Sequence, residues 1–128
     1  MTTTTPKHPA IGVTTPTSGV VSFEVPTPKP KKDEALIRVE WSTVSFFELW
    51  QVDFKLWDEY PRVLGVSIGG EVVIAGEDAG VQVGDKVISY DISSNITRAY
   101  QEYAIRDKYK IGKVSVMWMF GKHDLTQM

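Results

Sequence analysis

Three glycines lie within six positions of the stretch Leu-Gly-Val-Ser-Ile-Gly-Gly-Glu-Val at residues 64–72, a density found in loops that bind phosphate. A dinucleotide-binding loop needs the spacing G-x-G-x-x-G between a strand and a helix, because the free N–H groups of the helix must face the pyrophosphate. Here the spacing is G-x-x-x-G-G, and the β-branched segment 71–76 that follows predicts a strand. We therefore expect these glycines to serve the backbone and not a nucleotide.

Residues that could bind a metal or act as a nucleophile are scarce. The chain has no cysteine, which excludes disulfides and every thiolate zinc site. Its two histidines, His8 and His123, lie at opposite ends of the sequence and not at metal-ligand spacing. Neither G-x-S-x-G nor H-E-x-x-H occurs. A metal centre and a nucleophilic triad are therefore not predicted.

The segment from Ser45 to Tyr60 has apolar residues near helical intervals, with Glu48 and Asp53 between them. The two carboxylates are either an acid/base pair or part of a solvated helix face. From Trp41 to Tyr60, aromatic residues are denser than in the rest of the chain. They form either part of the core and a helix stripe, or a flat-walled pocket for an apolar or planar ligand.

Composition and charge exclude several classes of protein. A chain of 128 residues fits one domain, and its net charge of −2 gives no electrostatic reason to bind nucleic acid. The basic cluster at residues 29–32 is followed at once by Asp33 and Glu34, which is typical of a solvated connection. No apolar run approaches the roughly 20 residues that cross a bilayer, and the threonine-rich start does not resemble a signal peptide. We expect a cytoplasmic protein without a membrane segment.

Short strands separated by glycine and proline turns dominate the pattern. Residues 35–44 alternate, with Ile37, Val39 and Trp41 on one face and Arg38, Glu40 and Ser42 on the other. The pattern predicts an all-β barrel or sandwich with little helix. Further strands are expected at 11–14, 20–25, 71–75, 86–90 and 99–105. We expect residues 1–10 to be a disordered start, 11–114 a single domain, and 115–128 an atypical tail.

The order of several segments resembles one known family. The strand Glu-Ala-Leu-Ile-Arg-Val-Glu-Trp at 34–41 is followed by the aromatic turn, Arg-Val-Leu-Gly-Val at 62–66 and Gly-Glu-Val-Val-Ile-Ala-Gly at 70–76. Val-Gly-Asp-Lys-Val at 83–87 and Ala-Tyr-Gln-Glu-Tyr-Ala-Ile at 99–105 complete the set. Together they resemble the N-terminal GroES-like catalytic domain of the medium-chain dehydrogenase/reductase superfamily. The zinc-independent quinone oxidoreductases and polyketide enoyl reductases are the most similar branch.

This resemblance implies a fold, a chemistry and a site. It implies a mainly β, GroES-like, partly open barrel with one or two short helices, and an NADPH-dependent oxidoreductase acting on a small-molecule substrate. Zinc-dependent members place a cysteine and a G-H-E motif where this chain has Ser45 and the Val66–Ser67 region, so no zinc is expected. The resemblance makes four residues candidates for the cofactor and substrate cleft: Ser45, Phe46, Glu48 and Trp50.

Two expectations concern this chain by itself. Family members continue into a Rossmann domain, whereas this sequence ends at Met128 in an unfamiliar segment, so we expect a truncated form in which binding of NADPH is impaired and reductase activity is negligible. The alternative is a non-enzymatic GroES-like module that binds a partner or forms a homo-oligomer. In that case the apolar run at 114–120 is the expected contact surface.

Overall fold

The computed structural model describes residues 6–46, 48–50 and 59–114, and β-strands account for most of its regular structure. The strands are β1 (Lys7–Val13), β2 (Val21–Pro26), β3 (Glu34–Ser42), β4 (Arg62–Val63), β5 (Ser67–Ala75), β6 (Lys86–Tyr90), β7 (Tyr103–Asp107) and β8 (Ile111–Lys113). They form a three-stranded sheet in the order β2-β1-β4 and a five-stranded sheet in the order β7-β3-β5-β6-β8.

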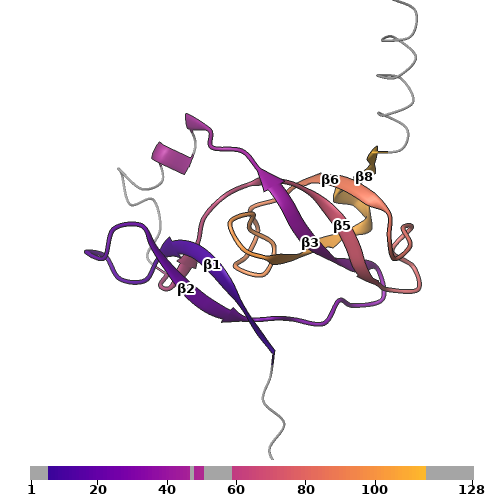
Figure 1. Ribbon diagram of the computed structural model, residues 1–128, viewed down its shortest axis with the longest axis horizontal. Helices are drawn as coiled ribbons and strands as arrows, with labels where there is room; N and C mark the ends of the chain where they lie inside the picture. The colour runs from indigo at the N-terminus through magenta and orange to yellow at the C-terminus, as the bar shows by residue number, and fades with distance from the viewer. Residues whose placement is uncertain (1–5, 47, 51–58, 115–128) are drawn as a thin grey trace, which may run out of the picture.

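Every pairing between these strands is antiparallel, and the strands curl into a partly open barrel (Figure 1). The mainly β prediction is confirmed. Residues 46 and 48–50 form one helical turn, and the 3₁₀ helix η1 (Lys108–Lys110) precedes β8. In the rest of the segment 45–60, where a helix was expected, Ser45, Glu59 and Tyr60 are not helical. Residues 47 and 51–58 lie outside the described residues. No helix in the described part of the chain is long and apolar enough to span a membrane.

The segment 99–102 joins the two sheets through backbone hydrogen bonds. The Ile11 N–H donates to the Tyr100 carbonyl at 2.7 Å, and the Glu102 N–H donates to the Pro9 carbonyl at 3.0 Å. The Glu102 carbonyl in turn accepts from the Val39 N–H at 2.8 Å. β1 and β3 are therefore held together by a segment that belongs to neither sheet.

The hydrophobic core lies against β3, β5, β6 and β7. Its fully buried side chains come from both long central strands and their neighbours: Ala35, Ile37, Ile68, Val72, Val87 and Ala104. Burying a branched aliphatic side chain contributes about 1.5–3 kcal/mol, so this cluster supplies much of the driving force for closing the barrel.

The first strand begins earlier than the sequence indicates. β1 starts at Lys7, so residues 7–10, which we expected in a disordered start, are part of a sheet, while residues 1–5 lie outside the described ranges. His8 is buried there, with Nδ1 hydrogen-bonded to the Thr27 hydroxyl at 2.6 Å and Nε2 donating to the Gln101 side-chain carbonyl at 2.8 Å. The proline and threonine content of this segment did not predict a strand. The residues that bury His8 lie far along the chain, so the local sequence does not show them.

The alternation expected along β3 fails at its end. Ile37 is buried as expected, but Trp41 remains 50% exposed. The pairing of β3 with β5 shifts register between Leu36 and Ile37 and again between Val39 and Trp41. Such irregularities change which side of the sheet the following residues face, because side chains alternate with period two.

The glycines of the 64–72 stretch serve the packing, as predicted. Gly69 and Gly70 lie within β5, where a Cβ atom would overlap the Trp41 indole and the Arg38 carbonyl, respectively. Gly65 adopts a φ of +94°, a conformation that glycine reaches without strain. Residues 67–72 of this stretch therefore belong to β5, which lies close to its neighbouring strands, and residues 67–71 pair with β6.

Gly70→Ala is expected to lower the free energy of unfolding by about 2–3 kcal/mol, because the added methyl group would force β3 and β5 apart at the Arg38 carbonyl. Urea denaturation monitored by circular dichroism measures the change. Gly112→Ala is the matched control, since its Cβ would meet only an ordinary contact with Ile88 at 3.6 Å. Equal effects of the two substitutions would contradict this account of Gly70.

Candidate functional site

Ser45 and Glu48 come together at the start of the helical turn that follows β3. The Ser45 N–H donates to Glu48 Oε2 at 2.8 Å, and the Ser45 hydroxyl donates to the same oxygen. This is the side-chain-to-backbone half of a capping box, in which the third residue of the helix satisfies the N–H of the capping serine. The spacing S-x-x-E was a sequence signal for this contact that the family resemblance had not used.

Glu48 is the most buried of the four candidate residues, at 3% exposure. Its second oxygen, Oε1, is also buried and has no hydrogen-bond partner among the residues that the structure describes. A buried carboxylate oxygen without a donor is costly, so such an atom needs a reason. Glu48 thus presents an unused acceptor next to the Ser45 turn.

Tyr100 is the residue that sequence reasoning missed. Its hydroxyl donates to the Thr43 carbonyl at 2.7 Å across a separation of 57 residues. Its ring packs on Gly65, where a Cβ would overlap the ring edge. Burial raises the pKa of Tyr100, and the nearby Glu48 carboxylate raises this pKa further. The phenol therefore stays protonated and continues to hold the chain just before Ser45.

The other two candidates, Phe46 and Trp50, lie on the outside of the turn. Phe46 is 79% exposed, and Trp50 is about half exposed. With Val44 and Leu49, which are also exposed, they form an apolar surface that we call the Ser45 face. Exposed apolar side chains that lie close together along the chain are found at ligand or partner surfaces. Of the four predicted site residues, the structure thus joins Ser45 to Glu48 and leaves Phe46 and Trp50 facing outward.

Arg106 on β7 is fully buried. Its guanidinium donates to the Thr97 carbonyl at 2.9 Å, the Ser89 hydroxyl at 3.0 Å and the Val66 carbonyl at 2.9 Å. Burial lowers the pKa of Arg106 to about 10, an effect that the charge of Asp91 partly offsets. Arg106 therefore remains charged at neutral pH and fixes Val66, the residue before β5.

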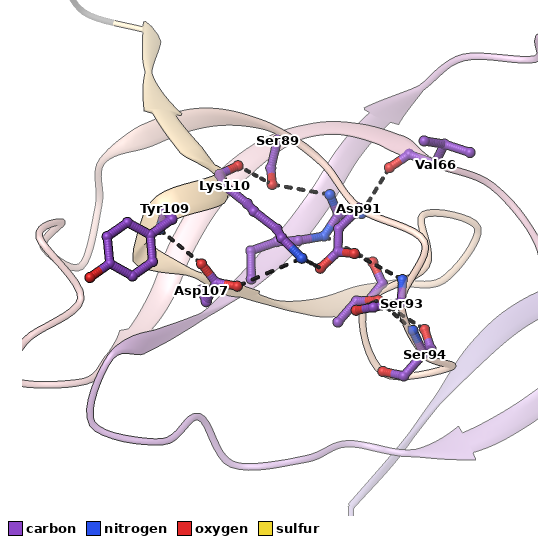
Figure 2. A network of polar contacts seen from close by, with 10 residues as sticks. Val66, Ser89, Asp91, Ser93, Ser94, Asp107, Tyr109 and Lys110 are labelled. Atoms are coloured by element: carbon purple, nitrogen blue, oxygen red, sulfur yellow. Dashed lines mark hydrogen bonds and ion pairs between the residues drawn. The ribbon is translucent and has the colours of Figure 1, made fainter.

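Asp91 also contacts Val66, because the Asp91 N–H donates to the Val66 carbonyl at 3.3 Å, and Figure 2 shows Lys110 and Ser93 beside Asp91. The Lys110 ammonium lies 3.2 Å from its carboxylate, and the Ser93 N–H donates to it at 2.8 Å. Burial alone would raise the pKa of Asp91, but the Ser93 hydrogen bonds and the Lys110 ammonium outweigh it, and the net pKa is lowered. Asp91 is thus stabilised as a carboxylate.

The positions where the family resemblance places zinc ligands carry no side-chain nitrogen or sulfur donor. Val66 is a buried aliphatic residue, and the Ser45 hydroxyl already donates to Glu48. Within residues 6–46, 48–50 and 59–114, no group of three or more histidine, aspartate or glutamate side chains is placed to hold a metal ion. Zinc prefers four ligands from imidazole, thiolate and carboxylate groups, which this donor set does not supply.

Comparison with known proteins agrees with this architecture. The family model described as the alcohol dehydrogenase GroES-like domain matches residues 31–121. An acryloyl-coenzyme A reductase from Sulfurisphaera tokodaii is 42% identical over 82 residues, which are 62% of this chain and 25% of that protein. A chloroplastic quinone-oxidoreductase homolog from Spinacia oleracea is 32% identical over 95 residues, covering 70% of this chain and 28% of the relative. The chain spans about a quarter of the length of these curated relatives.

Solved structures share the fold. The mycobacterial protein Rv1454c, whose structure is a complex with NADPH, superposes with a TM-score of 0.68 at 29% identity. The superposition covers 84% of this chain and 32% of that one. The barrel described above therefore recurs as one part of longer chains.

Arg106→Met should lower the free energy of unfolding by about 3–5 kcal/mol, because the Thr97 carbonyl and the Ser89 hydroxyl would lose a buried donor and the Val66 carbonyl would keep only the 3.3 Å hydrogen bond from the Asp91 N–H. Arg38→Met provides the control, since Arg38 is exposed and pairs with Glu71 at 3.4 Å on the surface. That control should change stability by no more than about 1 kcal/mol. Similar losses in the two variants, measured by urea denaturation, would show that the buried contacts contribute little.

Asp91→Asn is expected to cost about 1–3 kcal/mol at neutral pH and progressively less in acid. A carboxyl group with a lowered folded-state pKa contributes stability that is present above its unfolded pKa of about 4 and is lost as the pH falls through the folded value. The difference in unfolding free energy between native protein and variant should therefore be constant above about pH 5 and shrink below about pH 4. Asp78→Asn, at an exposed ion pair with Lys32, is the control. A difference in unfolding free energy between the native protein and Asp91→Asn that does not change with pH would contradict the lowered pKa of Asp91.

Proposed function

The chain belongs to the alcohol dehydrogenase GroES-like domain family of the medium-chain dehydrogenase/reductase superfamily, and we propose that it is the catalytic-domain portion of an NADPH-dependent reductase of the enoyl or quinone type. The observation that carries this proposal is the Ser45 turn, where a buried carboxylate with an unused oxygen adjoins an exposed apolar face. Such a combination of apolar walls and a few fixed polar groups is typical of sites for small molecules.

The substrate class follows from the relatives and from the chemistry of the Ser45 face. One relative is named for the reduction of acryloyl-coenzyme A and another for a quinone. Both substrates present a flat, conjugated, uncharged group, which suits the exposed rings of Phe46 and Trp50. NADPH, when bound, supplies the hydride. Phe46 and Trp50 exclude water from the reacting group, and Glu48 Oε1 accepts a hydrogen bond from a donor in the cleft.

We propose that this reaction runs without catalytic zinc. The support is the local chemistry, in which Val66 occupies the position of a metal-binding histidine and the Ser45 hydroxyl is engaged by Glu48. A tetrahedral site built on these groups would lack the nitrogen or sulfur donors that zinc prefers.

NADPH needs contacts that the glycine stretch does not offer. The backbone of residues 67–71 pairs with β6, so its glycines do not present free N–H groups to a pyrophosphate at a helix end. Hydride transfer requires the donor and acceptor carbons to be held about 3–3.5 Å apart. We therefore propose that a separate nucleotide-binding unit holds the cofactor and that this chain alone is a very poor reductase.

A non-enzymatic binding or oligomerisation role remains the alternative. It rests on the apolar run at 114–120, of which only Val114 lies among the described residues. This alternative stays a prediction. Light scattering would support it by detecting a discrete oligomer that removal of residues 115–128 abolishes.

A chimera tests the enzymatic proposal. Residues 7–114 of this chain replace the corresponding part of the acryloyl-coenzyme A reductase that it resembles, and consumption of NADPH is measured with acryloyl-coenzyme A and with a quinone. We expect saturable turnover by the chimera and none by the isolated chain. Treatment with a chelator should leave the rate unchanged.

Glu48→Gln in the chimera should reduce kcat/KM by at least about tenfold, because the amide loses the charge that strengthens hydrogen bonds to a donor in the cleft. Glu77→Gln, in an exposed turn, should have no effect. A folded chimera that binds NADPH but turns over neither substrate would refute the proposal.

A further inference from the structure

A groove of about 420 Å³ lies between β1 and β3, over the segment that joins the two sheets. Ala10 and Ala99 are its small, buried floor, and Ile11 and Trp41 are half-exposed apolar residues at its sides. The volume lies within the usual range for small-molecule sites, about 300–1,000 Å³. Neither the relatives nor the proposed reaction accounts for this groove.

The aromatic wall of the groove is held in place from behind. The Trp41 indole packs against Gly69, where no Cβ could fit, so the ring is supported by the backbone of β5. Half of the Trp41 side chain nevertheless remains accessible. Tyr100, fixed by its hydrogen bond to the Thr43 carbonyl, forms another aromatic part of the lining. The groove therefore offers preformed flat surfaces.

The charge of the groove comes from one carboxylate. Of the two acidic residues that line it, Glu40 is paired with Lys86 at 2.6 Å. Lys86 also contacts Glu71, which pairs with Arg38, so these four charges balance. Among the described residues, the Glu102 side chain has no ion pair or hydrogen bond, and no lysine or arginine lines the groove. An apolar groove with one unneutralised carboxylate favours a cationic ligand.

The backbone around the groove disfavours an extended peptide as the occupant. Such a peptide binds through unpaired main-chain groups of a strand edge. Here the N–H groups of Ile11, Val39 and Glu102 all donate to carbonyls within the junction. Binding must therefore depend on side-chain surfaces, as it does for small molecules.

We propose that this groove binds a small organic amine, with its aromatic or branched apolar body between Trp41 and Ile11 and its ammonium group beside Glu102. Ammonium groups are also attracted to the faces of aromatic rings, which strengthens the fit to Trp41. This site is independent of the proposed reductase reaction, because it requires neither NADPH nor the Ser45 face.

Phenethylamine, phenethyl alcohol and hydrocinnamate test the proposal as cationic, neutral and anionic probes of similar size. Each is titrated into the isotope-labelled full chain, and amide shifts are followed by heteronuclear NMR. We expect saturable shifts at Ala10, Trp41 and Tyr100, with phenethylamine binding about fivefold more tightly than hydrocinnamate. The absence of saturable shifts at these residues, or equal affinities for amine and acid, would overturn the proposal.

Variants separate the contributions of charge and shape. Glu102→Gln should abolish the preference for the amine, while Glu77→Gln, in an exposed turn outside the groove, should preserve it. Trp41→Ser should weaken binding of the alcohol by about tenfold and of the amine by at least as much, whereas Trp41→Phe should retain most of the binding. Should Trp41→Ser not fold, Ile11→Ser tests the opposite wall at an exposed position. If Glu102→Gln kept the preference for phenethylamine over hydrocinnamate, the ammonium group would not lie beside Glu102 and the proposal would be wrong.

Discussion

The buried guanidinium of Arg106 is the constraint on which the arrangement of this domain depends. A charge inside a protein must be solvated by internal dipoles, and Arg106 finds its acceptors in the segment before β5, in β6 and in the loop before β7. These segments cannot move independently without leaving the charge unsolvated. The position of Val66, next to the Gly65 that packs on Tyr100, is thereby determined by a residue 40 positions away.

The candidate site is held by one local contact and one distant contact. The capping contact between Ser45 and Glu48 is local, and it directs a carboxylate inward at the start of a helical turn. Tyr100 then holds the chain before that turn through the Thr43 carbonyl. Since Gly65 leaves room for the tyrosine ring, the glycine stretch contributes to the site through packing and not through phosphate binding.

Much of the fold could be predicted because strand patterns and turn residues are local signals. β6 was predicted with its observed bounds, and the glycine spacing correctly excluded a phosphate loop. β1 and Trp41 were predicted incorrectly for different reasons. The burial of His8 depends on Gln101, 93 residues away, and the exposure of Trp41 depends on a register shift against β5. Neither partner is visible in the local pattern.

The sequence by itself determined the class of fold and the family, because these depend on residue types and on their order along the chain. Only the tertiary structure decided which polar groups meet. The Tyr100 contact, the solvation of Arg106 and the groove between β1 and β3 all arise where segments distant in sequence come together. The physical reason is that burial and hydrogen bonding depend on neighbours in space, whereas periodicity records only neighbours along the chain.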